Sequence, residues 1–144
     1  WQLTEQNKNM LEFTRAMIAL RHRHPSLSRQ RFLTGEMQEG QPLPDIRWYG
    51  PTLDAPNWDD DETRTLAFTL AGDAAQEPPL HVMLNVAEEA VAFSLPSLAG
   101  WQWHLAVDTA RGHAASDPEA QPSLDGGSRS VEGRSVVVLE GRRV

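Results

Sequence analysis

Residues 3–27 read LTEQNKNMLEFTRAMIALRHRHPSL, and this stretch decides the fold because it predicts one helix with too much apolar surface to stay uncovered. Placed on a wheel of about 100° per residue, its large apolar side chains gather in roughly half of the circumference: Leu3, Met10, Leu11, Phe13, Met17, Ile18 and Leu20. Charged residues such as Lys8 and Arg15 take the other half. The helix therefore requires a partner surface.

The ends of this helix are also marked in the sequence. Thr4 is placed to cap the first turn with its hydroxyl, and Glu5 suits the positive end of the helix dipole. The bases at positions 21–24, with His22 and His24 among them, suit the negative end, and Pro25 then stops the helix. We therefore expect a helix over residues 5–23.

From position 45 onward the apolar period changes from 3.6 to 2, which indicates half-buried strands. The expected strands are residues 46–49, 65–71, 81–86, 91–95, 101–108 and 135–140. The short gap between 81–86 and 91–95 favours an antiparallel hairpin, and the last strand, apolar on both faces, is expected at the centre of its sheet. Residues 111–127 are expected to form a long mobile loop. The pattern predicts a mainly β protein, an antiparallel β-sandwich preceded by one amphipathic helix.

Within the expected strands, alternation assigns side chains to faces. It places Val82, Leu84 and Val86 together, and it places Val91, Phe93 and Leu95 together. In residues 101–108 one face is expected to carry Trp101, Trp103, Leu105 and Val107.

Length and charge limit what the chain can be. At 144 residues it has room for about one domain, which we divide into residues 1–35 (helix and connection) and residues 36–144 (sandwich). The net charge of −7 is uneven, +4 over residues 1–35 and −13 over residues 36–128, so a nucleic-acid partner is not expected. No apolar run is long enough to span a membrane. A start at Trp1 without a signal peptide suggests a piece of a longer, cytoplasmic bacterial protein.

Four tryptophans are candidates for stacking on sugar rings: Trp48, Trp58, Trp101 and Trp103. Because Trp101 and Trp103 share their expected face with Leu105 and Val107, a place in the sandwich core is the stronger interpretation for them. Trp48 and Trp58 flank a proline-rich acidic loop, which favours exposure or contact with a neighbouring domain.

Other patterns give no catalytic centre. The acidic run at residues 59–62 lacks the alternate spacing and glycine of a calcium loop, and a solvated loop explains it better. The five histidines have no zinc-ligand spacing, the chain has no cysteine, and neither a nucleophile elbow nor a phosphate loop occurs. We therefore expect no catalytic residue, no metal and no cofactor in this chain.

The order of several short motifs resembles the end of isoamylase-type glycogen debranching enzymes of the α-amylase superfamily. The motifs, with x for any residue, are NxxMLxFTxxMIALRxxHPSL at 7–27, RFLTG at 31–35, DIRW at 45–48, NW at 57–58, LNV at 84–86, FxLP at 93–96, WxxxVDTA at 103–110 and RSVVVL at 134–139. They cover nearly the whole chain, and their order and spacing make the resemblance specific.

The resemblance implies that the helix is the last helix of a (β/α)₈ barrel missing from this chain, and that the sandwich is the C-terminal domain packed against that barrel. It assigns Met10, Leu11, Phe13, Met17, Ile18 and Leu20 to the barrel-packing face. The family cleaves α-1,6 branch linkages of glycogen and related glucans with carboxylates of the barrel, which lie upstream of Trp1. No catalytic residue is transferred to this chain.

Three interpretations stay open from the sequence. The favoured one is a non-catalytic structural part of a debranching hydrolase, whose partners are the barrel of the same polypeptide and, for the parent, α-glucan. The second is an α-glucan-binding module that uses the tryptophans, and the third is an unrelated sandwich interaction domain with a helical arm. Without the barrel, the helix is expected to fold back on its own sandwich or to associate with another copy.

Overall fold

A computed structural model describes residues 4–41, 43–74 and 76–144 of the chain. The helix α1 (Glu5–Arg23) comes first, followed by the 3₁₀ turn η1 (Pro25–Ser28). The strands are β1 (Ile46–Tyr49), β2 (Thr65–Leu70), β3 (Leu80–Asn85), β4 (Val91–Ser94), β5 (Trp101–Asp108), β6 (His113–Ala114), β7 (Ser128–Val131) and β8 (Ser135–Arg143), and the turns η2 (Thr109–Arg111) and η3 (Pro118–Ala120) flank β6.

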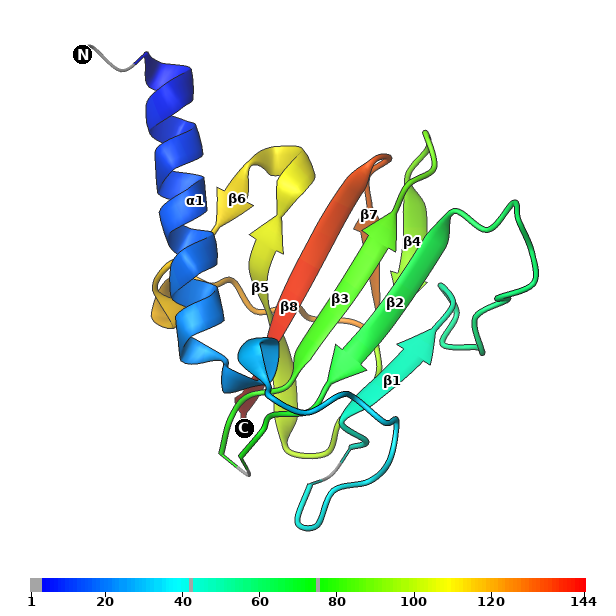
Figure 1. The fold of residues 1–144 in the computed structure, drawn as a ribbon. Helices are drawn as coiled ribbons and strands as arrows, with labels where there is room; N and C mark the ends of the chain where they lie inside the picture. Colours follow the sequence, from blue (N-terminus) through cyan, green and yellow to red (C-terminus); the bar gives the residue numbers. More distant parts are fainter. Residues whose placement is uncertain (1–3, 42, 75) are drawn as a thin grey trace.

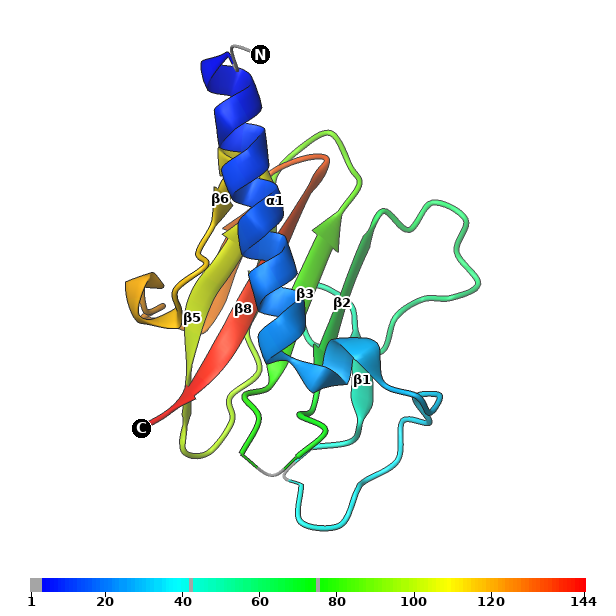
Figure 2. The same cartoon turned by 60° about the vertical axis from the view of Figure 1, so that its left-hand side comes forward.

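These elements form three layers (Figure 1). The middle layer is a six-stranded antiparallel sheet in the order β1-β2-β3-β8-β5-β6, and a two-stranded sheet, β4-β7, lies behind it. The helix α1 crosses the opposite face of the large sheet, as the turned view in Figure 2 shows. The predicted fold class, an antiparallel sandwich with one N-terminal helix, is confirmed.

Each of the two spaces between adjacent layers is filled by a hydrophobic core. The sandwich core lies between the two sheets, and its buried members are Tyr49, Ala67, Met83, Phe93, Leu95, Trp103, Leu105, Val131, Val137 and Leu139. The helix core lies under α1, and its buried members are Leu20, Ile46, Leu70, Leu80, Ala106, Val107 and Val138. Because α1 contributes Leu20 to a core built mostly from strands, the helix is packed on its own sheet, the first of the two outcomes expected for it.

The helix begins and ends where the sequence predicts. Thr4 is the N-cap, and its Oγ1 accepts a hydrogen bond of 3.2 Å from the backbone N–H of Asn7. His24, extended ahead of Pro25, closes the C-terminal end. Leu3, which the wheel placed on the apolar side, lies outside the described residues.

The predicted hairpin between β3 and β4 is wrong. Strand β3 is already paired on both edges, with β2 and with β8, so it has no free edge for β4. The chain instead crosses to the second sheet, where β4 pairs with β7. Asn85 holds the crossing, because its side-chain amide donates to the carbonyl oxygens of Glu89 and Val131 at 2.8 and 3.0 Å.

Strand β3 alternates as predicted, but its apolar face is not the more deeply buried one. His81, Met83 and Asn85 are fully buried towards the small sheet, whereas Val86 is exposed. His81 hydrogen-bonds Thr69 across the strand pair, 2.9 Å between Nδ1 and Oγ1, and burial lowers the pKa of its imidazole to about 4. The site is therefore built for a neutral imidazole at pH 7.

Strand β5 departs from the expected single apolar face. Its pairing with β8 shifts register between Leu105 and Val107, which marks a bulge at Ala106. Trp103 and Leu105 consequently enter the sandwich core, while Val107 turns to the helix core. The prediction that Val107 shares a face with Trp103 is wrong for this reason.

The segment expected to be a long loop, residues 111–127, contains β6 and η3 and runs beside β5. The backbone N–H of Leu105 donates to Pro122 at 2.9 Å, and that of Leu124 donates to Trp103 at 2.9 Å. Strand β7 was also missed, because residues 128–131 are polar apart from Val131. The prediction for the last strand is confirmed, since β8 lies between β3 and β5.

Candidate docking surface and its anchoring ion cluster

The apolar half of α1 is divided between two surfaces. Its inner side, at the spacing i, i+3, i+4, i+7, comprises Phe13, Ala16, Met17 and Leu20. Ala16 and Leu20 are buried, and Phe13 and Met17 are half-buried against the helix core. Three of the six residues predicted to face a barrel, Phe13, Met17 and Leu20, therefore contact the chain's own sheet.

The other three predicted residues are exposed, and Met10 also lines a hollow beside Phe13 and Thr109. We call Met10, Leu11 and Ile18 the outer stripe; their side chains are 64%, 38% and 52% exposed. Since the two buried residues of α1 lie in its C-terminal half, the N-terminal half extends past the sheet, as Figure 2 shows. The outer stripe is thus an exposed apolar surface on a helix whose inner side is packed on the large sheet.

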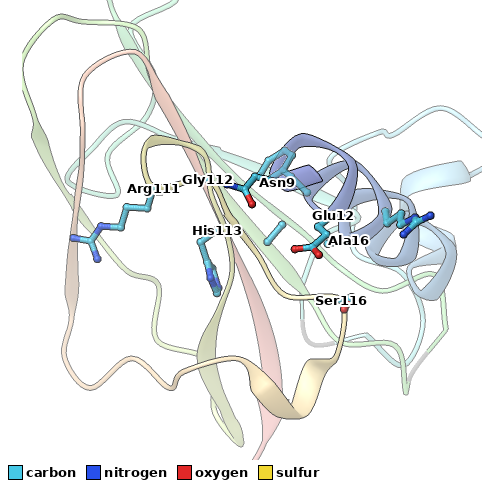
Figure 3. A pocket seen from close by; sticks show the side chains of 10 residues that line it. Asn9, Glu12, Ala16, Arg111, Gly112, His113 and Ser116 are labelled. Carbon is cyan, nitrogen blue, oxygen red and sulfur yellow. The ribbon is translucent and has the colours of Figure 1, made fainter. Parts of the chain in front are cut away.

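A cleft lies beside α1 on the side of β6, and no residue of the outer stripe lines it. It measures about 500 Å³ and lies between α1 and the segment from Arg111 to Ser116. Figure 3 shows Asn9 and Glu12 reaching from α1 toward this segment, while Arg111 extends away from the helix.

The predicted sugar-stacking tryptophans fall into different environments. Trp103 is buried in the sandwich core, where its indole N–H donates to the carbonyl oxygen of Pro96 at 2.8 Å. Trp101 is half-buried, and the guanidinium of Arg143 lies 5.0 Å from its ring centre. Burial leaves the Trp103 ring no free face for stacking.

Trp48, in β1, lies beside Trp58, in the connection between β1 and β2. Their rings meet edge to face at 5.6 Å, and Trp48 also contacts Phe68. Trp58 is 65% exposed and forms one wall of a groove of about 300 Å³, whose floor includes Leu66, Leu84 and Val86. We call this hollow the Trp58 groove.

The acidic run beside the Trp58 groove is exposed along its length, as a solvated loop predicts. Asp60 accepts a hydrogen bond of 2.9 Å from the backbone of Glu62, and Arg64 pairs with the Glu62 carboxylate at 3.3 Å. These contacts are local to the loop.

An ion cluster at the C-terminal end of α1 was not foreseen from the sequence. Arg23 pairs with Glu140 of β8 at 2.9 Å, and His24 Nε2 lies 3.0 Å from the same carboxylate. Gln121 donates to Glu140 at 2.7 Å, and His24 Nδ1 lies 3.6 Å from Glu77, in the connection between β2 and β3. The cluster therefore joins the helix end to three separate parts of the sandwich.

Glu140 is ionised despite its burial. Burial raises the pKa of its carboxyl, but hydrogen bonds from His24, Arg23 and Gln121, with the charge of His24, outweigh that effect and lower the pKa to about 2. The signal for this cluster was present in the sequence, because Glu140 is a single acid in an apolar strand. Only the fold shows which cations face it.

A second buried carboxylate shapes the connection after η1. Asp45 accepts hydrogen bonds from the backbone N–H groups of Thr34, Gly35 and Ile46 at 2.7 to 2.8 Å. Burial raises the pKa of its carboxyl, and these bonds more than offset that effect, so the pKa is lowered. The loop so organised presents Phe32 almost wholly to solvent, which adds an apolar side chain to the surface available to a neighbouring domain.

Comparison with known proteins agrees with these features. The family model for the C-terminal region of isoamylases 1–3 matches residues 47–118, half of the chain, from β1 to η3. The chain is 29% identical to the chloroplastic isoamylase 2 of rice, over 94% of its own length, and 29% identical to an isoamylase of a Flavobacterium species, over 88% of its length. It spans 18% of each of these relatives. The chain belongs to the isoamylase family and corresponds to its C-terminal region.

Proposed function

We propose that this chain is the non-catalytic C-terminal portion of a cytoplasmic bacterial debranching enzyme, which hydrolyses α-1,6-glucosidic branch linkages in glycogen or limit dextrin. The sandwich packs on the catalytic (β/α)₈ barrel of the same polypeptide and stabilises it, while the catalytic carboxylates belong to the barrel. The outer stripe of α1 supports this most directly: three large apolar side chains are held in order on a helix whose inner side is already packed.

The apolar surface that α1 leaves uncovered gives the physical reason for this proposal. Covering Met10, Leu11 and Ile18 gains about half of the roughly 1.5–3 kcal/mol that full burial of such a side chain gives, because each is already partly covered. An exposed apolar patch on an ordered helix marks an interaction site. A chain that spans 18% of its relatives leaves the greater part of such an enzyme to supply the covering surface. The barrel is therefore the expected occupant.

Ile18→Glu is expected to act differently in the full polypeptide and in the 144-residue chain alone. In the full polypeptide that carries this chain, we expect the substitution to lower the thermal stability of the debranching activity, because a charge enters the buried interface. In the 144-residue chain alone, where Ile18 is half exposed, the free energy of unfolding should change by no more than about 0.5 kcal/mol. Residual activity after heating and urea denaturation of the chain measure the two effects.

Lys8→Gln is the matched control, because it makes the same change in net charge on an exposed polar position of α1. It should leave both measurements unchanged. An equal effect of Ile18→Glu in both contexts, or none in the full polypeptide, contradicts docking through the outer stripe.

The Trp58 groove favours a second candidate function, binding of α-glucan. Its exposed indole beside Trp48, with Asn57, Asp60 and Arg64 at the rim, offers an apolar face and hydrogen-bonding groups to a sugar ring. Adding maltoheptaose should then give a saturable change in tryptophan fluorescence at millimolar sugar. Trp58→Ala should abolish that change and Trp101→Phe should preserve it; no change in the wild-type chain excludes this function.

A further inference from the structure

His24 is enclosed between two carboxylates. Its side chain is fully buried, with Nε2 3.0 Å from Glu140 Oε1 and Nδ1 3.6 Å from Glu77 Oε1. The two acids come from different elements, β8 and the connection between β2 and β3. Both ring nitrogens of one residue at the end of α1 thus face the sandwich.

The chemistry of imidazole makes this arrangement dependent on a proton. A neutral ring has one donor and one acceptor nitrogen, so it can serve only one of the two carboxylates, whereas the imidazolium has two donors. A buried charge without a counter-charge costs free energy. The pair Arg23 and His24 balances the charges of Glu140 and Glu77 only when His24 carries its second proton.

The other groups around the cluster give hydrogen bonds to both carboxylates but, apart from Arg23, no positive charge. Glu140 also accepts from Arg23 and Gln121, and Glu77 accepts from the backbone N–H groups of Ser26 and Asp73 at 2.9 and 2.6 Å. His104 of β5 is the cross-strand neighbour of Glu140, but its Nδ1 lies 3.2 Å from the carbonyl oxygen of Gln121. Farther out, Arg142 and Arg29 face Glu119 and Asp73 at 3.7 and 3.8 Å.

We infer that His24 is a proton-dependent clasp that fixes the C-terminal end of α1 on the sandwich through Glu140 and Glu77. With the proton the clasp is closed; without it, the buried cluster holds two carboxylates against the single charge of Arg23, and the helix end loosens. His24 is thus a positioning residue, and its effect on the parent enzyme, through the outer stripe and the barrel, rests on the proposed function. The clasp itself does not.

Pulsed electron resonance on the 144-residue chain tests the clasp. The chain has no cysteine, so Lys8→Cys on α1 and Glu132→Cys between β7 and β8 place two spin labels at exposed positions. We expect a narrow distribution of label distances at about pH 5 and a broader one at about pH 9, across the range in which imidazole titrates. Histidine side-chain ¹⁵N shifts, recorded on the same samples, report whether His24 carries its second proton.

The variants separate the clasp from a simple structural contact. His24→Gln should give a broad distribution at both pH values, and His104→Gln should keep the wild-type response. If His24→Gln does not fold, Glu77→Gln still tests the clasp: it removes one of the two acceptors, so the midpoint of broadening should move to lower pH. A wild-type distribution that is the same at both pH values, or a pH response that survives in His24→Gln, overturns the inference.

Neither result depends on the proposed function. If the clasp works but Ile18→Glu leaves the full polypeptide unaffected, the docking proposal fails alone. If Ile18→Glu acts as expected and the distances do not respond to pH, the clasp fails alone.

Discussion

Glu140→Gln is expected to lower the free energy of unfolding of the chain by about 3–5 kcal/mol near neutral pH, the cost of removing one partner from a buried ion pair. The substitution leaves Arg23 and His24 without the carboxylate that faces both of them at 2.9 and 3.0 Å. It keeps the size of the side chain, so the loss reports charge rather than packing. Urea denaturation followed by tryptophan fluorescence measures it.

The control is Glu119→Gln, which removes an exposed carboxylate that lies 3.7 Å from the partly buried Arg142 and should cost less than about 1 kcal/mol. Acid gives an independent check. Because folding lowers the pKa of Glu140 to about 2, its contribution is complete above the ordinary value of about 4.5 and is lost as the pH falls from there to about 2. Wild-type stability should decline more steeply than that of Glu140→Gln over this interval; parallel declines contradict the assignment.

Phe93→Ala is expected to cost about 3–5 kcal/mol, as removal of a buried aromatic ring does. Phe93 is fully buried and is one of the two β4–β7 residues, with Val131, in the buried set of the sandwich core. Its loss therefore weakens the attachment of the whole second sheet. Thermal and urea unfolding of the 144-residue chain measure the effect.

Ala92→Ser on the same strand is the matched control. Ala92 is exposed next to Phe93, so the change should stay within about 0.5 kcal/mol. A loss of less than about 1 kcal/mol for Phe93→Ala would mean that β4 and β7 contribute little to the fold in solution.

Periodicity was enough to locate α1 and six of the strands, because each is set by its own apolar pattern. The pairing partners of the strands, in contrast, do not follow from the local sequence. The short gap between β3 and β4 suggested a hairpin, but β2 and β8 occupy both edges of β3, and no pattern within residues 81–95 records that competition. Strand β7 was missed because a short edge strand needs little apolar character of its own.

The candidate site was predicted only in part for a similar reason. The sequence identified the apolar half of α1, but the division into inner side and outer stripe depends on where the helix crosses the sheet. His81 and Asn85 were overlooked because polar residues inside a core satisfy their hydrogen bonds with distant partners. The ion cluster likewise joins residues more than one hundred positions apart.

The bulge at Ala106 couples the stabilities of the two cores. Because of it, β5 serves both sides of the large sheet, and β8 does so by alternation, with Val137 and Leu139 on one side and Val138 on the other. Unfolding of either the helical layer or the small sheet would expose buried side chains of β5 and β8. Thermal unfolding of the two cores is therefore expected to be cooperative, whereas a loosened end of α1 leaves the sandwich core between the two sheets in place.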